Sequence, residues 1–121
     1  MELIRNDTIK VLSNPGCDSR QLLYPGNSQS ERITLTEVHV APGASQPRHA
    51  HAASEQIWYA LRGAGVLLLG DGQEVSFSAG DVVRFADGDI HGLRNDGSEP
   101  FVYVSVTSPP IHFGPAYRNE R

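Results

Sequence analysis

The chain has 121 residues, and its formal net charge is −4 because 14 Asp and Glu residues outnumber 10 Lys and Arg residues. This length suits one hydrophobic core, so we expect a single domain over residues 1–121. An acidic balance gives no general attraction for phosphate backbones or anionic lipids. We therefore expect neither a nucleic-acid partner nor a membrane partner.

Three further features bear on the compartment. The first ten residues lack a basic segment followed by an apolar one, so we expect no secretory signal. The longest apolar run covers residues 66–69, far short of a membrane span. Cys17 is the only cysteine, so no disulfide can form within the chain, and its turn-rich surroundings indicate an ordinary thiol. These features favour a cytoplasmic protein.

Short runs rich in β-branched and aromatic residues follow one another along the chain, separated by Gly- and Pro-containing turns. Several alternate with a period of two, and none continues into an amphipathic helix. The runs cover residues 32–40, 56–61, 65–69, 74–78, 81–85 and 101–107. This pattern predicts an all-β antiparallel barrel or sandwich. The first 30 residues and the last dozen are less regular, and we expect them to wrap the barrel or contact a partner chain.

Two of the five histidines, His49 and His51, are one residue apart. In a strand, residues i and i+2 point to the same face, so both imidazoles can reach one point. Such a pair is weak evidence alone, because it also arises by chance on surfaces. His91 follows another strand-like run and a glycine-bearing turn, so it can enter the same barrel from a different strand. Three imidazoles form a plausible metal site with open positions for water or substrate.

Residues 43–63 and 80–95 together resemble the paired signature of the cupin superfamily. In the first segment, Gly43 is followed by five residues and then by His49-Ala50-His51. In the second, the signature positions hold Gly80, Gly88, His91 and Asn95, and Ala86 stands where proline is usual. Two spaced motifs in the expected order are more specific than either motif alone.

The resemblance implies a cupin double-stranded β-helix, or jelly-roll, barrel that binds a small-molecule ligand inside it. It also implies one divalent transition-metal ion (Mn, Fe, Ni or Zn) held by His49, His51, His91 and a fourth side chain. Small cupins commonly pair through an outer sheet, so the resemblance makes a homodimer the expected assembly.

Two adjacent side chains, Glu55 and Gln56, compete for the fourth position. Four residues separate Gln56 from His51 and six separate it from Gly63, so Gln56 meets both spacings of the signature. Glu55 meets only the first. Adjacent strand residues face opposite ways, so only one of the two points inward. We favour Gln56, whose neutral amide would leave the charge of the ion unneutralised and favour an anionic substrate such as a carboxylate or enolate.

Five other side chains could line the substrate pocket or could have ordinary surface or core positions. The pocket candidates are Trp58, Arg48, Arg94, Phe85 and Tyr103. The two arginines flank the ligand histidines and could pair with a substrate carboxylate, although solvated arginines are common. The aromatic residues serve equally well as core. His39 and His112 fall outside both segments, so we interpret them as non-ligands, and Asn95 as a turn residue.

The leading hypothesis for function is a metal-dependent enzyme of lyase, isomerase or dioxygenase type that acts on a small polar organic molecule. The absence of a clear general acid or base beside the histidines motivates a second hypothesis, a non-catalytic binding or sensing module. A purely structural barrel with vestigial histidines is the third. The fold alone does not choose among them, because this superfamily hosts many activities.

Overall fold

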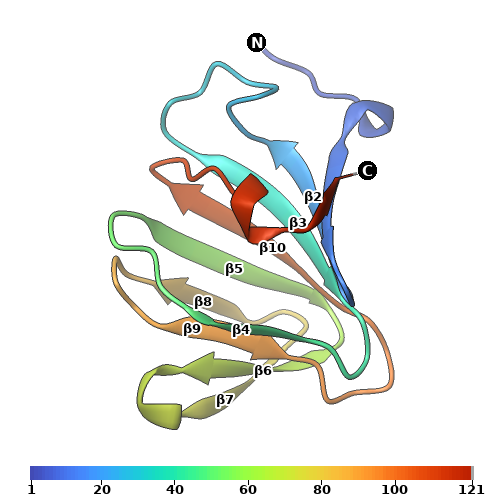
Figure 1. Ribbon diagram of the computed structural model, residues 1–121, viewed down its shortest axis with the longest axis vertical. Helices are drawn as coiled ribbons and strands as arrows, with labels where there is room; N and C mark the ends of the chain where they lie inside the picture. Colours follow the sequence, from blue (N-terminus) through green and yellow to red (C-terminus); the bar gives the residue numbers. More distant parts are fainter. Residues whose placement is uncertain (121) are drawn as a thin grey trace.

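The computed structural model describes residues 1–120, and strands dominate it (Figure 1). The strands are β1 (Lys10–Asn14), β2 (Cys17–Leu23), β3 (Thr34–Val40), β4 (Ser45–His49), β5 (Glu55–Arg62), β6 (Ala64–Leu69), β7 (Glu74–Ser78), β8 (Val82–Phe85), β9 (His91–Arg94), β10 (Phe101–Ser108) and β11 (Asn119–Glu120). Short 3-10 turns lie at Asn6–Thr8, Gly70–Gly72 and Gly114–Ala116. Within residues 1–120, no helix is long and apolar enough to cross a membrane.

The strands form two antiparallel sheets that face each other. The larger sheet has the order β11-β1-β2-β3-β10-β5-β8, and the smaller has the order β4-β9-β6-β7. Figure 1 shows the smaller sheet packed against the β5 and β8 end of the larger one. The prediction of an all-β barrel is confirmed, and the runs that predicted strands correspond to β3, β5, β6, β7, β8 and β10.

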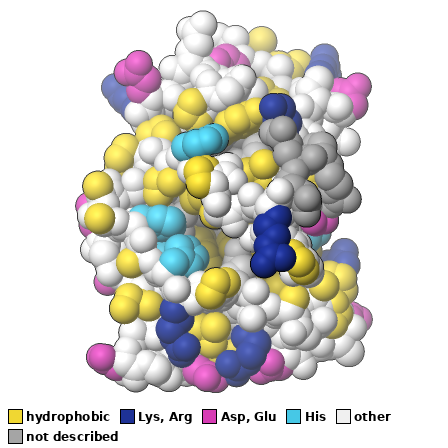
Figure 2. All heavy atoms as spheres, viewed as in Figure 1, with side chains coloured by type: hydrophobic (Ala, Val, Ile, Leu, Met, Phe, Trp, Pro, Cys, Tyr) yellow, Lys and Arg dark blue, Asp and Glu magenta, His cyan; other side chains and the backbone are white. Residues whose placement is uncertain are grey.

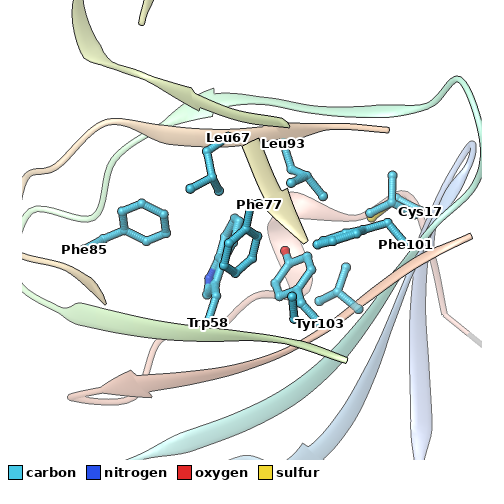
Figure 3. Close-up of a cluster of buried hydrophobic side chains, with 11 residues drawn as sticks. Cys17, Trp58, Leu67, Phe77, Phe85, Leu93, Phe101 and Tyr103 are labelled. Atoms are coloured by element: carbon cyan, nitrogen blue, oxygen red, sulfur yellow. The ribbon is translucent and has the colours of Figure 1, made fainter. Parts of the chain in front are cut away.

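Period-two alternation in the larger sheet separates an inner face from an outer one. Along β3 the side chains alternate between buried and half-buried from Thr34 to Val40, and β5 buries Gln56, Trp58 and Ala60 in the same way. The buried apolar side chains of both sheets meet in one cluster (Figure 3). Trp58 and Tyr103 of the larger sheet lie in it with Leu67 and Leu93 of the smaller one. One end of the barrel interior is therefore filled with side chains.

The structure corrects the prediction for the first 30 residues. They do not simply wrap the barrel, because β1 and β2 pair with each other and β2 pairs with β3 as part of the larger sheet. The inward residues of β2 are Cys17, Ser19 and Gln21, which are small or polar, so the strand shows no apolar alternation in the sequence. Residues 109–118 do run back across the barrel, and β11 pairs with β1.

Candidate metal centre

The pairing of β4 with β9 places His49 directly opposite His91. A β-bulge between Gln46 and His49 shifts the register of β4 on the way to this pair. Gly92 permits the close approach of the two strands, since a Cβ atom there would lie 2.7 Å from the Gln46 carbonyl oxygen. Neither strand is among the strand-like runs found in the sequence, because β4 carries Pro47 and is largely polar, and β9 has only four residues.

His51 lies two residues beyond the end of β4, in the loop that leads to β5, and not within the strand as the spacing argument assumed. A backbone hydrogen bond of 2.8 Å from the Gly88 N–H to the His51 carbonyl oxygen holds this loop against the turn that precedes β9. Gly88 has a φ of 83°, which a glycine adopts without strain. This bond joins the two histidine-bearing segments.

The three imidazoles converge on one point. Each histidine offers a ring nitrogen, and these nitrogens all lie within 4.8 Å of one another. The ring centroids of His49 and His91 are 4.3 Å apart, and those of His49 and His51 are 5.0 Å apart. Exposure falls from His49, which is exposed, through half-buried His51 to buried His91. The group is therefore open to solvent on the His49 side, and Figure 2 shows histidine side chains beside a hollow on this face.

Hydrogen bonds fix which ring nitrogen faces the centre in His49 and His91. The Nδ1 atom of His91 is 3.0 Å from the Asp89 carbonyl oxygen, and the Nδ1 atom of His49 is 2.9 Å from the Pro47 carbonyl oxygen. A carbonyl oxygen only accepts, so each Nδ1 carries the proton and each Nε2 keeps a lone pair. The Nε2 atoms of His51 and His91 are buried without a hydrogen-bond partner.

Burial keeps the imidazoles of His51 and His91 neutral. Burial lowers the pKa of His91 to about 4, and the neighbouring His49 and His51 add a smaller lowering. Burial also lowers the pKa of His51, with a further contribution from His49. A buried nitrogen lone pair without a donor is costly in a folded protein unless something occupies it. Neutral imidazoles with free lone pairs are what a divalent transition metal requires, so the group fits such an ion.

The faces of β5 separate the two candidates for the fourth ligand. Gln56 is buried on the inner face and lines the cavity beside the histidines. Its Nε2 atom donates to Thr107 Oγ1 at 2.9 Å, and its Oε1 atom accepts from the Trp58 indole N–H at 3.2 Å. Glu55 points outward, where its carboxylate accepts from the Arg84 guanidinium at 2.8 Å. Of the two, only Gln56 lies on the side of the histidines.

Aromatic side chains hold the buried side of the group. The ring of Phe85 stacks on His91 with centroids 4.3 Å apart and an angle of 11° between the planes. Trp58 meets both rings edge-on, at 5.4 Å from His91 and 5.0 Å from Phe85. On the open side, Phe113 of the C-terminal segment approaches His51 with centroids 6.1 Å apart. These contacts restrict the orientation of His91 most strongly.

A cavity of about 400 Å³ extends from the histidines into the barrel. This volume lies within the range of about 300–1,000 Å³ typical of small-molecule sites. The described lining residues are His49, His51, Gln56, Trp58, Tyr103, Ser105, Thr36, Val38, Ser19, Cys17, Asn14, Ser45, Gln46, Pro47, Ala50, Phe113, Ala116 and Tyr117. His49 and His51 thus line one part of a cavity that is partly open to solvent.

The structure places only part of the predicted pocket residues in this lining. Trp58 and Tyr103 lie there, whereas Phe85 packs behind His91. Both arginines are turned away from the cavity. Arg48 is exposed and donates to the Leu69 carbonyl oxygen at 2.8 Å, whereas Arg94 is half-buried and forms ion pairs with Glu74 and Asp96. The two histidines that were interpreted as non-ligands lie away from the three-histidine group. His39 pairs with the Glu37 carboxylate on the outer face of β3, and His112 is exposed.

Several lining residues were missed in the sequence. Cys17 and Ser19 share the inward parity of β2, a signal that becomes readable only once β2 is known to be a strand. Tyr117 and Phe113 come from the C-terminal segment, and no periodicity in that segment points to a cavity. Asn95, in contrast, has the expected backbone role, donating to the Val40 and Glu99 carbonyl oxygens.

Comparison with known proteins agrees with this architecture. A protein from Methanocaldococcus jannaschii is 27% identical over 91% of this chain and 90% of its own length. An oxalate-binding protein from Thermotoga maritima is 34% identical over 60% of this chain and 59% of its own length. A gentisate 1,2-dioxygenase from Ralstonia sp. is 28% identical over 85% of this chain, which spans only 27% of that enzyme.

Solved structures show the same fold. KdgF from Halomonas sp. superposes with a TM-score of 0.78 at 20% identity, covering 92% of this chain and 96% of that chain. A protein with a double-stranded β-helix domain from Klebsiella pneumoniae gives a TM-score of 0.76 at 25% identity, covering 91% of each chain. Residues 36–107, which include both histidine-bearing segments, match the family described as the cupin domain. This chain belongs to the cupin family.

Proposed function

We propose that this cupin is a metal-dependent enzyme that acts on a small organic molecule bound inside the barrel. The observation that carries the proposal is the pair of buried, unpartnered Nε2 atoms of His51 and His91, which share one centre with a nitrogen of His49. Metal binding is common in cupins, and a lone-pair arrangement of this kind is the usual protein half of such a site. The proposed ion is Mn, Fe, Ni or Zn.

The residues of the chain supply binding and orientation. His49, His51 and His91 would hold the ion, with Gln56 as the proposed fourth ligand. When bound, a divalent metal acts as a Lewis acid that polarises a carbonyl, carboxylate or dioxygen oxygen. The exposed side of His49 leaves access from solvent, and the aromatic rings of Trp58 and Phe85 keep water from the buried side. Lyase, isomerase and dioxygenase chemistry all remain compatible with this arrangement.

A second candidate function is a non-catalytic binding or sensing module. It is favoured by the cavity lining, where the described residues include no Asp, Glu, Lys or Arg that could serve as a general acid or base. A relative whose name is oxalate-binding protein is consistent with it. The two candidates share the metal centre and differ only in turnover.

The metal centre is tested by metal analysis of protein purified without chelators. We expect about one equivalent of a divalent transition metal in the wild type and its loss in His51→Ala and His91→Ala. His39→Ala is the matched control, because His39 lies on the outer face and pairs with Glu37. A wild type without metal, or a His51→Ala variant that binds as much as the wild type, contradicts the proposal.

Turnover separates the enzyme from the binding module. A substrate screen with the metal-loaded protein should include carbonyl and carboxylate compounds, with and without oxygen. The enzyme hypothesis expects conversion of at least one compound, lost in His91→Ala and kept in His39→Ala. Binding of such compounds without any conversion supports the module instead.

We also propose that the protein is a homodimer. Apolar side chains lie exposed on the outer face of the larger sheet: Ile57, Tyr59 and Leu61 of β5, and Val82 of β8. Tyr59 and Val82 are paired neighbours, so the exposed residues form a continuous patch, which we call the outer patch. Covering such a patch with a second copy is favourable. A cytoplasmic location and a single domain stay predictions.

A further inference from the structure

The cavity has two chemically different ends. At one end stand the histidines, next to β5. At the other end, which we call the distal end, lie Cys17 and Ser19 of β2 with Tyr117 of the C-terminal segment. Strands β10 and β3 separate β5 from β2, so the ends are three strand spacings, about 14 Å, apart along the sheet. A ligand that fills the cavity must therefore satisfy two separate environments.

The distal end offers no charge to a ligand. The described lining residues include no Asp, Glu, Lys or Arg anywhere in the cavity. The charged residues of the neighbouring strands face the opposite side of the sheet, where Arg20 pairs with Glu37 at 3.0 Å. Burial also raises the pKa of Cys17 to about 11 and that of Tyr117 to about 12. Both groups therefore stay neutral near pH 7.

The wall between the two ends is flat and aromatic. The ring of Trp58 stacks on Tyr103 with centroids 4.2 Å apart and an angle of 27° between the planes (Figure 3). The polar atoms of these rings are already occupied, since the Trp58 N–H donates to Gln56 and the Tyr103 hydroxyl donates to Gln46 at 2.7 Å. What the two side chains present to the cavity is mainly their apolar surface.

The polar groups of the distal end are neutral and bound to one another. Ser19 accepts a hydrogen bond from Gln21 at 2.9 Å, and Tyr117 interacts with Ser19 and Cys17. Hydroxyl and thiol groups can form hydrogen bonds with a neutral oxygen or nitrogen of a ligand. They cannot balance a full charge, and an ionised group that loses its water without a partner binds poorly.

We propose that the cavity takes a flat, largely apolar organic molecule that carries one metal-binding oxygen function and no charge elsewhere. The proposal rests on the metal centre inferred above, because any anionic oxygen of the ligand would have to lie at that end. It includes small aromatic compounds with a hydroxyl, carbonyl or carboxylate head. It excludes sugar phosphates and other molecules whose second charge would fall at the distal end.

The test uses two ligands of nearly identical shape that differ in one charge. Both 4-(N,N-dimethylsulfamoyl)benzohydroxamate and 4-sulfobenzohydroxamate carry a hydroxamate that binds metal, and the dialkylated sulfonamide has no N–H to lose to zinc, so the hydroxamate fixes the head at the histidines. Their opposite ends are an uncharged sulfonamide and an anionic sulfonate. Acetohydroxamate, which has the head alone, reports on the metal centre separately. Binding to the Zn²⁺-loaded protein can be followed through the indole N–H resonance of Trp58, since the chain has a single tryptophan.

We expect the sulfonamide to bind at least about 10-fold more tightly than the sulfonate, and more tightly than acetohydroxamate. A sulfonate that binds as well as the sulfonamide overturns the proposal. So does a sulfonamide no better than acetohydroxamate, because the body of the ligand would then gain nothing from the cavity. If the protein takes up no metal, the proposed function is wrong. The charge preference of the cavity can then still be tested by comparing the affinities of toluenesulfonamide and toluenesulfonate for the metal-free protein.

Two variants of Tyr117 test whether the preference for the uncharged ligand arises at the distal end. Tyr117→Lys introduces a cation there, on a segment outside the core strands, and should shift the preference towards the sulfonate by about 10-fold or more. Tyr117→Phe keeps the ring without the cation and should retain the preference for the sulfonamide. An unchanged preference in Tyr117→Lys contradicts the placement of the ligand body at this end.

Discussion

The indole N–H of Trp58 donates a hydrogen bond to the side-chain oxygen of Gln56, with the two atoms 3.2 Å apart. Because the Gln56 amide nitrogen donates to Thr107 at the same time, the orientation of the amide is fixed from both sides. The oxygen keeps a second lone pair, which is the one that our proposal assigns to a metal. The neighbouring Glu55 has no such position, since it pairs with Arg84 outside the barrel.

Exchanging the amide for a carboxylate tests this assignment. In Gln56→Glu the Trp58 N–H can still donate, and the Thr107 hydroxyl can turn to donate as well. We expect metal affinity to rise about 10-fold or more, because an anionic oxygen joins the ligands, while the metal-free protein loses about 1–3 kcal/mol of unfolding free energy. A metal-competition titration and urea unfolding with chelator present measure the two effects.

The control is Glu55→Gln. Removing an exposed ion pair should change the unfolding free energy by less than about 1 kcal/mol and leave metal affinity unchanged. If Glu55→Gln weakens metal binding and Gln56→Glu does not strengthen it, then Glu55 is the fourth ligand.

Close packing of β4 against β9 is a second requirement of the site. In Gly92→Ala the new Cβ would meet the Gln46 carbonyl oxygen at 2.7 Å and the Arg48 amide nitrogen at 3.0 Å, so the strands must move apart. We expect a loss of about 1–3 kcal/mol in unfolding free energy and a weaker metal affinity, as His49 moves away from His91. Gly70→Ala is the control, because its Cβ would meet nothing closer than 3.9 Å. Equal metal affinity in both variants contradicts the prediction.

The buried thiol of Cys17 makes stability depend on alkaline pH. Burial is the main cause that raises its pKa from 9.0 to about 11. Between these values the unfolded chain releases the proton and the folded chain keeps it, so stability falls as pH rises. Relative to Cys17→Ser, the wild type should lose about 1 kcal/mol of unfolding free energy between pH 8 and pH 10. Urea unfolding at both pH values measures this, and a constant difference between the two proteins argues against a raised pKa.

The outer patch predicts a change of assembly when it is made polar. Tyr59 is 46% exposed and lies in the middle of β5 on the outer face, so Tyr59→Glu should preserve the fold. We expect light scattering to report a dimer for the wild type and a monomer for Tyr59→Glu, because a dimer would bury the introduced charge. Val75→Glu changes a residue of similar exposure, 48%, on β7 of the other sheet and should leave the dimer intact. If the wild type is a monomer, the proposed homodimer is wrong.

Some features of the site can be predicted from the sequence because they depend on local spacing. Short runs rich in β-branched and aromatic residues predicted six of the strands, and the parity of β5 put Gln56 and Glu55 on opposite faces. Features of the site that depend on long-range contacts could not be predicted from local spacing. His51 reaches the centre from a loop, held by a long-range bond to Gly88, and no local pattern encodes that bond. Arg48 was weighed as a pocket residue against a solvated surface role, and its partner, the Leu69 carbonyl oxygen, is 21 positions away in the chain.

The all-β class, the family and the histidines that can share a metal can be predicted from the sequence, because periodicity and motif spacing are properties of short segments. The shape and the chemistry of the cavity, in contrast, depend on how distant segments pack together. Its distal end is built by Cys17 and Ser19 of β2 together with Tyr117, from opposite ends of the chain. The sequence of β2 shows no apolar alternation, because its inward residues are small or polar. The cavity is uncharged because the charged side chains of the surrounding strands lie on the outer faces of the sheets. Both depend on long-range strand pairing, which short-range patterns do not contain.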